Sequence, residues 1–319
     1  MNKKKTVENY IINFICVIAL YLTLYILIKN GVINSYYESV IIFICINIIL
    51  ATSLNLTTGF LGQLALGHAG FVAIGAYTSA LFTKSVKLPF VEFPVALLLG
   101  GIVAAIFGIA IGIPALRLRG DYLAIITLAF SEMIRVFIVN SKFTGGAKGL
   151  SGIPMMSNFT NVFIITVIII TLLFLLIRSR HGRAIISIRE DEIASEAMGI
   201  SATYYKILGF TISAFFAGIG GGIFAHYITM LEARKFNFMY SVEILIIVVF
   251  GGMGSFTGSI IAAVVLTIFN EALRDFSIYR IIVYSVLLII IMIFKPGGLL
   301  GRYEFSMSKK LKKVGIKSE

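Results

Sequence analysis

Nine long apolar runs constrain what this chain can fold into, because about 20 apolar residues are what one helix needs to cross the hydrocarbon core of a bilayer. The runs lie near residues 11–28, 37–56, 64–83, 94–116, 122–141, 161–177, 205–229, 242–273 and 280–296. Only 13% of the 319 residues are charged, against roughly 25% in an ordinary soluble domain. A membrane-spanning backbone must satisfy its own hydrogen bonds, and the period-two alternation of a membrane β-barrel is absent. The sequence therefore predicts an all-α, polytopic membrane protein.

The run at 242–273 is too long for one ordinary span, and the glycine-rich stretch GGMGSFTG interrupts it. Two passes across this run give about ten transmembrane helices, and one pass gives nine. If the first helix enters from the cytoplasm, the segments on that side hold 17 Lys and Arg residues and the opposite side holds nine. This asymmetry follows the positive-inside rule, and both termini are cytoplasmic only with an even number of crossings. Ten spans are therefore expected, although re-entrant pieces would preserve the parity differently. The predicted hinge residues are Gly251, Gly252, Gly254 and Gly258.

The formal charge of +12 follows from this topology. It predicts a basic rim that faces anionic cytoplasmic lipids, and no basic face suited to nucleic acid. Residues 1–35 combine a basic segment with an apolar stretch that lacks a small-x-small cleavage site, so they predict a retained first helix and not a signal peptide. Cys16 and Cys45 lie inside apolar runs without metal-type spacing, and we expect both to be packing residues.

Two stripes of small residues predict close helix packing. On each, small side chains recur every four positions, which lets two helix backbones approach in the membrane. We expect these stripes to be exposed, where they would favour contact with a second membrane subunit. The stripes are Gly100, Ala104, Gly108 and Gly112 on one helix, and Ser213, Ala217, Gly221 and Ala225 on another.

The stretch from Leu54 to Tyr77 is rich in glycine and contains Gln63 and His68, although it must lie at or within the membrane. Irregular backbone at that depth survives only where it is buried in protein or lines a polar path. The interpretation of His68 stays open between a buried imidazole with a neighbouring hydrogen-bond partner and a group that faces the path. A metal site is not expected, because the three histidines are far apart in the sequence and have no companion ligands.

Glu132 and Arg135 fall near the middle of the apolar run at 122–141, where placing a charged side chain in the bilayer costs free energy. Their i,i+3 spacing puts them on one helix face, within reach of each other. They predict either mutual neutralisation at a helix interface or a position on a polar path or a subunit contact, where a zwitterionic ligand would offer opposite charges to both.

Residues 178–204 form a charged segment between two apolar runs. Isoleucines, Ala197 and Met198 alternate with charged residues, which predicts a short amphipathic helix. Acidic residues favour its N-terminus, and Gly199 is placed to stop it. An ordinary solvated loop is the alternative. The residues predicted to couple this segment to a soluble partner protein are Arg189, Glu190, Asp191, Glu192, Glu196, Ala197, Met198, Gly199 and Ile200.

Six motifs in order resemble the M-type permease subunit of branched-chain amino-acid ABC importers. They are NLTTGFLGQLALGHAGFVAIGAY, LRGDYLAIITLAFSEMIR, GGAKGLSGIP, IREDEIASEAMGI, GGMGSFTGSIIAA and KPGGLLG. The resemblance spans about residues 40–301, and EAMG is similar to the signature that docks on an ATPase subunit. It implies a type II importer permease domain over 36–301, followed by a basic cytoplasmic tail at 302–319.

The resemblance also implies a location and partners. We expect a multi-pass protein of the bacterial plasma (inner) membrane that works with a second homologous permease as a heterodimer, two ATP-binding subunits and an extracytoplasmic substrate-binding protein. The expected substrates are leucine, isoleucine and valine, with urea, amides or other amino acids as alternatives. GGMGSFTG lacks the GK[ST] ending of a phosphate-binding loop, so ATP hydrolysis is expected in a partner, with no cofactor in this chain. An ATP-independent secondary transporter is the rival class, and a membrane enzyme would need a cluster of His, Asp or Glu.

Overall fold

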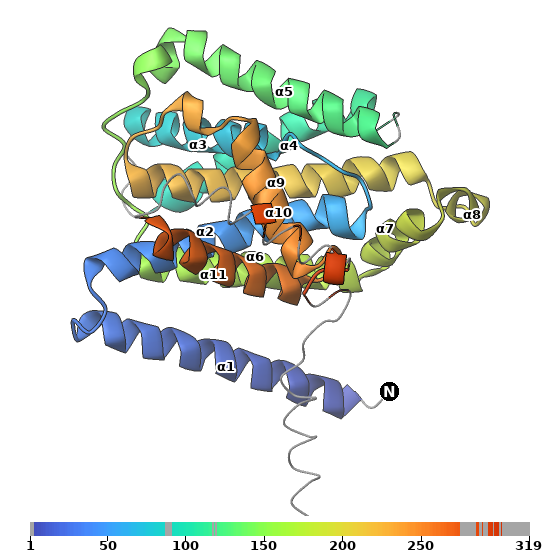
Figure 1. Cartoon of the computed structure of the whole chain (residues 1–319), viewed down its shortest axis with the longest axis horizontal. Coiled ribbons are helices and arrows are strands. Elements are labelled where there is room, and N and C mark those ends of the chain that lie inside the picture. The colour runs from blue at the N-terminus through green and yellow to red at the C-terminus, as the bar shows by residue number, and fades with distance from the viewer. Residues whose placement is uncertain are drawn as a thin grey trace, which may run out of the picture.

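The computed structural model describes residues 3–86, 91–116, 118, 120–274, 285–286, 289, 293–295, 297–299 and 301. Within this part the structure is helical, and its long helices lie roughly side by side (Figure 1). The helices are α1 (Lys3–Lys29), α2 (Ser35–Asn55), α3 (His68–Ser85), α4 (Glu92–Ala115), α5 (Asp121–Asn140), α6 (Phe159–Arg178), α7 (Arg180–Glu190), α8 (Glu192–Ala197), α9 (Ala202–Ile228), α10 (Phe238–Gly251) and α11 (Phe256–Ala272). A π-helical turn, η1 (Leu56–Phe60), continues α2, and η2 (Lys142–Thr144), η3 (Gly146–Lys148) and η4 (Ala233–Lys235) are 3-10 turns.

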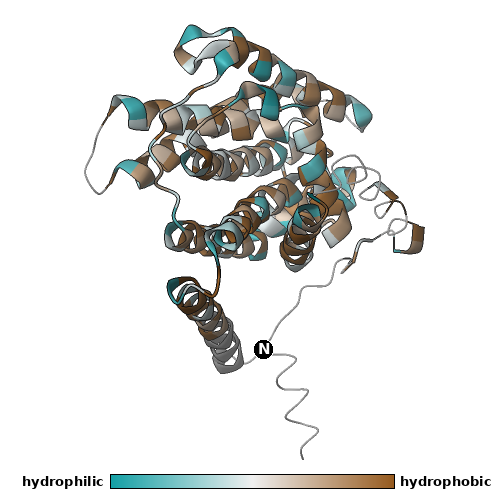
Figure 2. Cartoon of the chain, turned by 60° about the vertical axis from the view of Figure 1, so that its left-hand side comes forward, coloured by the Kyte–Doolittle hydropathy of each residue, from teal (hydrophilic) through white to brown (hydrophobic). Residues whose placement is uncertain are grey.

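Five described helices are long and apolar enough to cross a membrane. They are Ser35–Phe60, Glu92–Ala115, Asp121–Asn140, Phe159–Arg178 and Ala202–Ile228. The shorter apolar helices are Ile15–Lys29, Phe238–Gly251 and Phe256–Ala272. Figure 2 shows that apolar residues cover much of the long helices, as lipid-facing surfaces require. The predicted all-helical membrane fold is confirmed, whereas the count of about ten stays a prediction. The predicted span at 280–296 lies mostly outside the described residues, and the tail at 302–319 lies wholly outside them.

Helix α9 is the central element of the bundle. It packs against α4, α3 and α2, and every residue from 213 to 226 except Phe215 is buried. At the crossing of α3, α4 and α9, a Cβ on Gly218 would lie 2.7 Å from the Ala104 Cβ, and a Cβ on Gly75 would overlap the Gly218 carbonyl. Only glycine fits such contacts, so small residues set the distance between these helices.

The two small-residue stripes are therefore internal. Gly100, Ala104 and Gly108 of α4 are buried against the chain's own α3 and α9, and Gly221 of α9 is buried against the Val72 carbonyl of α3. The prediction of close helix packing is confirmed, but the expectation that the stripes are exposed to a second subunit is wrong. Intramolecular packing uses the same small-residue pattern that a partner helix would use.

Helices α10 and α11 meet at a glycine corner, residues 251–258. The backbone at Gly252 has φ +117° and that at Gly254 has φ +90°, a region that favours glycine. Side-chain Oγ of Ser255 accepts the Gly258 N–H at 3.0 Å and caps α11. With 14 and 17 residues, the helices extend about 21 and 25 Å, less than the hydrocarbon thickness of about 30 Å. The long run is thus split at the predicted glycines, into two short helices and not two full-length ones.

Several chain segments that were predicted to be cytoplasmic lie at the same end of the bundle. In Figure 1 the start of α1, the start of α5, the start of α9, and α7 with α8 all lie on the right. Helix α8 protrudes there beyond the neighbouring helices. This end of the bundle is where the candidate coupling residues gather.

Candidate functional site: a protruding helix and the polar contacts behind it

The charged segment folds into two helices and not into the single amphipathic helix predicted from the sequence. Helix α7 ends at Glu190, Asp191 is extended with φ −154° and ψ 111°, and α8 begins at Glu192. The Asp191 carboxylate accepts the Ala194 N–H at 2.9 Å, so this residue caps the second helix. The acidic cluster does favour a helix N-terminus, but that terminus is the start of α8, in the middle of the predicted helix.

Helix α7 uses its apolar face inside the chain. Ile185 is fully buried and Ile188 is 4% exposed, where α7 packs against α9 and η1. The Ser179 hydroxyl accepts the Gly182 N–H at 3.3 Å and caps the start of the helix. Helix α7 is thus packed against the bundle, and Ile185 and Ile188 are not available to a partner protein.

Helix α8 presents its apolar side chains outward. Ile193 is 73% exposed and Met198 is 83% exposed, and Ala197 and Glu196 beside them are also exposed. The helix ends in a Schellman motif, in which the Gly199 N–H bonds to the Glu196 carbonyl at 2.9 Å and the Ile200 N–H bonds to the Ser195 carbonyl at 3.0 Å. Gly199 has φ +84°, which confirms the prediction that this glycine ends the helix. Exposed apolar side chains at the tip of a membrane protein are suited to bind another protein.

An ion pair holds α8 in place. The ammonium of Lys206, on the first turns of α9, lies 2.7 Å from Oε1 of Glu192. Lys206 is only 3% exposed, and its partner carboxylate is partly covered. In the sequence, Lys206 is one of the 17 basic residues of the predicted cytoplasmic side. The signal for this buried ion pair was a lysine within an apolar run, directly after the charged segment.

Arg189 points into the protein, in contrast to its neighbours in the predicted coupling set. Its guanidinium donates through Nη1 to the Gly59 carbonyl at the end of η1, and Nη2 lies 3.4 Å from the Glu190 carboxylate. Its side chain is 16% exposed, against 54% for Glu190. The structure therefore separates Arg189, which contacts the bundle, from Glu196, Ala197 and Met198, which face outward.

Asn55 is a buried polar residue that the sequence analysis did not single out. Its Nδ2 donates to the Ser255 carbonyl at 2.9 Å and to the Ser259 hydroxyl at 2.7 Å, and its Oδ1 accepts the Gly254 N–H at 2.9 Å. These three bonds use both amide donors and the amide oxygen. The available signal was an asparagine at the end of an apolar run, because a buried amide requires partners.

The irregular segment that was predicted around Gln63 and His68 is present. Residues 61–67 are not helical, and α3 begins at His68. His68 is 2% exposed and its Nε2 lies 3.0 Å from the Ser53 hydroxyl, which fits the buried-imidazole interpretation. Gln63 is partly exposed. Of these two candidate path residues, only Gln63 is therefore accessible in the single chain.

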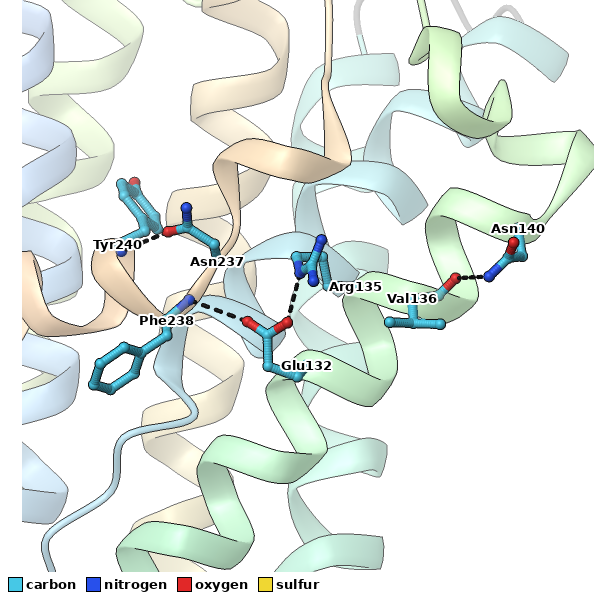
Figure 3. Close-up of polar contacts among 7 residues, drawn as sticks. All are labelled: Glu132, Arg135, Val136, Asn140, Asn237, Phe238 and Tyr240. Atoms are coloured by element: carbon cyan, nitrogen blue, oxygen red, sulfur yellow. Dashed lines mark hydrogen bonds and ion pairs between the residues drawn. The ribbon is translucent and has the colours of Figure 1, made fainter.

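Glu132 and Arg135 form the predicted pair. Nε of Arg135 donates to Oε2 of Glu132 at 2.7 Å, and the other carboxylate oxygen accepts the Phe238 N–H at 3.2 Å (Figure 3). Glu132 thus joins the middle of α5 to the first residue of α10, whose positive helix end favours a carboxylate. The exposed fraction of the side chain is 30% for Glu132 and 29% for Arg135. The pair is therefore partly accessible and not fully buried.

An apolar cavity lies on another face of α5. It has a volume of about 450 Å³ between α3, α4 and α5, and its walls include Tyr77, Phe107, Phe130 and Met133. Glu132 and Arg135 are not part of its lining. Helix α5 therefore carries its charges and this cavity on different faces. In the described part of the chain, no three His, Cys, Asp or Glu side chains come together in a metal-binding arrangement.

Comparisons with known proteins show which proteins this chain is similar to. A family model described as branched-chain amino acid transport system, permease component, matches residues 36–295. The high-affinity branched-chain amino acid transport system permease protein LivM of Salmonella typhimurium is 40% identical over 290 residues, which cover 80% of this chain and 68% of that protein. LivM of Escherichia coli is 39% identical with the same coverage, and LivH of Escherichia coli is 25% identical over 80% of this chain and 91% of its own length. No solved structure matches the chain.

Proposed function

We propose how this chain works from the premise that it belongs to the family of permease components of branched-chain amino acid transport systems. It is a membrane permease subunit of an ABC importer, and its transported substrates are leucine, isoleucine and valine. It forms part of the translocation path and passes the motion of a separate ATPase to its own helices. The permease itself carries out no ATP hydrolysis.

The observation that carries the coupling role is the exposed apolar surface of α8. Ile193 and Met198 protrude at the end of the bundle where the predicted cytoplasmic segments meet. Such side chains in water favour burial against a partner. We assign them to a groove on an ATP-binding subunit, with Glu196, Ala197 and Gly199 completing the docking surface. Both chain termini are proposed to lie on this cytoplasmic side.

The complete importer is proposed to contain further subunits. A heterodimer with a homologous permease is supported by the resemblance of this chain to both LivM and LivH of Escherichia coli. Two ATP-binding subunits then drive the pair, and an extracytoplasmic binding protein delivers the substrate. Because the small-residue stripes are buried inside this chain, the permease contact must use another surface.

The translocation path is proposed to pass by Gln63, Glu132 and Arg135. All three are partly accessible in the single chain, and the charged pair offers an anion and a cation to a zwitterionic amino acid. His68 is better explained as a packing residue, since it is buried beside Ser53. The glycine corner at 251–258 is proposed to act as a hinge.

Reconstitution tests the proposed function. The purified complex, placed in liposomes with its binding protein, is expected to accumulate labelled leucine, isoleucine or valine only with ATP. Vanadate should abolish this uptake, and a protonophore should leave it unchanged. Uptake that persists without ATP and collapses with the protonophore would identify a secondary transporter instead. Uptake of urea or amides in place of these amino acids would overturn the substrate assignment.

A further inference from the structure

Hydrogen bonds and close backbone packing together connect helix α7 to the glycine corner between α10 and α11. We infer that Arg189 and Asn55 are positioning residues that transmit displacement of the ATPase-bound helices to this corner. The inference rests on the proposed function and assigns Arg189 a role other than docking. Asn55 is fully buried and the Arg189 side chain is 16% exposed, so neither belongs to the outward apolar surface of α8.

Arg189 reaches the corner from the cytoplasmic side. Its guanidinium donates to the Gly59 carbonyl, one of the last carbonyls of the continuous helix formed by α2 and η1. A cation is favoured there, because the C-terminal carbonyls of a helix carry partial negative charge. A Cβ on Gly62 would lie 2.8 Å from Cγ of Arg189, and a Cβ on Gly254 would lie 2.8 Å from its Nη1. Arg189 is thus enclosed by η1, the segment after it and the corner itself.

Asn55 contacts the corner from the end of α2. It is the last residue of α2, and its amide bonds to the backbone of Gly254 and Ser255 and to the Ser259 hydroxyl. These residues span the turn and the first turn of α11. A movement of α2 relative to α11 must therefore either carry the corner with it or break buried hydrogen bonds.

Gly59 lies between the two side chains. A Cβ at this position would overlap both the Asn55 carboxamide oxygen and the Gly254 nitrogen. The contact therefore runs from α7 through Arg189 to Gly59 and Gly254, and on through Asn55 to α11. Its parts are packed against one another, as a physical route for coupling requires. The positive φ angles of Gly252 and Gly254 give the corner the glycine backbone that a change of direction needs.

The test compares uptake with ATP hydrolysis in the same vesicles. The complete complex is reconstituted with Arg189→Gln or with Asn55→Ala, and labelled leucine taken up per ATP hydrolysed is measured. Both variants are expected to lower this ratio at least tenfold, while the ATP-binding subunits copurify in the wild-type proportion. Arg189→Lys keeps the positive charge and the aliphatic part of the side chain but loses the several N–H donors of the planar guanidinium. It should give an intermediate ratio. Arg234→Gln removes an exposed cation of η4 and should leave the ratio unchanged.

Three results would contradict this inference. The first is a wild-type ratio in both Arg189→Gln and Asn55→Ala. The second is loss of the ATP-binding subunits from Arg189→Gln with a wild-type ratio in Asn55→Ala, which would make Arg189 a docking residue. The third applies if Arg189→Gln and Asn55→Ala fail to assemble. In that case a wild-type ratio in Arg189→Lys would contradict the inference, because the guanidinium contacts would be dispensable. Failure of the wild-type vesicles to take up any branched-chain amino acid would contradict the proposed function itself.

Discussion

Lys206 Nζ lies 2.7 Å from Oε1 of Glu192, and this ion pair ties the protruding helix α8 to the central helix α9. Lys206 is almost fully buried, and that carboxylate supplies the counter-charge for its ammonium group. Because α9 packs against α2, α3 and α4, any force on α8 reaches the core of the bundle through this contact and through α7. Helix α8 has only six residues, but this ion pair and α7 attach it to the bundle.

Removing Glu192 should loosen α8. Glu192→Gln leaves the buried ammonium of Lys206 without its counter-charge, which should cost about 1–3 kcal/mol. Thermal stability of the purified protein is expected to fall, and the ATP-binding subunits should copurify less. Glu192→Gln combined with Lys206→Met should be more stable than Glu192→Gln alone. If the stability losses of Glu192→Gln and of Lys206→Met simply add in the double variant, the two residues do not interact.

Glu132 and Arg135 should behave as one unit. Glu132→Gln and Arg135→Gln are each expected to damage folding or uptake more than the double replacement, with a coupling energy of about 0.5–3 kcal/mol. The value should be below that of a fully buried pair, because both side chains are partly exposed. A double variant that folds but does not transport assigns the pair to the path, and one that transports normally assigns it to structure. Strictly additive losses would refute the interaction.

Two glycines of α9 should respond oppositely to alanine. A Cβ on Gly221 would overlap the Val72 carbonyl, so Gly221→Ala must push α3 away and should cost about 1–3 kcal/mol. Gly209→Ala is the matched control, because its Cβ would meet Leu61 at an ordinary 3.4 Å. It should be neutral or stabilising by up to about 1 kcal/mol, since alanine favours the helix. Thermal unfolding in detergent distinguishes the two, and equal effects would contradict the packing described.

The chain should not work alone. Purification in mild detergent is expected to yield a complex with one copy of this chain and one copy of a homologous permease. Mass measurement of the intact complex checks this composition. A homodimer of this chain that transports leucine with no second permease would contradict the proposed heterodimer.

The sequence predicts much of this fold because lipid leaves the backbone little choice. Apolar runs must be helices, and the predicted spans at 94–116 and 122–141 agree with α4 and α5 to within two residues at each end. The glycine corner and the Gly199 stop were also predictable, since few other residues adopt those backbone angles.

Other features depend on contacts between distant parts of the chain. Asn55 and Gly254 are 199 residues apart, and no periodicity in either segment connects them. Residues 178–204 form two helices because the Asp191 carboxylate caps the second helix. This side-chain cap competes with continuation of the first helix. The small-residue stripes predicted close packing correctly, but a stripe does not say whether its partner helix belongs to the same chain.

The most direct test of the central claim is substrate-stimulated ATP hydrolysis by a complex that carries Ala197→Arg. Ala197 is exposed on α8, and arginine keeps the helix while placing a long charged side chain on the docking surface. Ala147→Arg, at an exposed alanine of η3, is the matched control. We predict that Ala197→Arg inserts normally but loses stimulated hydrolysis and leucine uptake, whereas the control keeps both. Stimulated hydrolysis and uptake at the wild-type level in Ala197→Arg would contradict the assignment of α8 as the ATPase-docking helix.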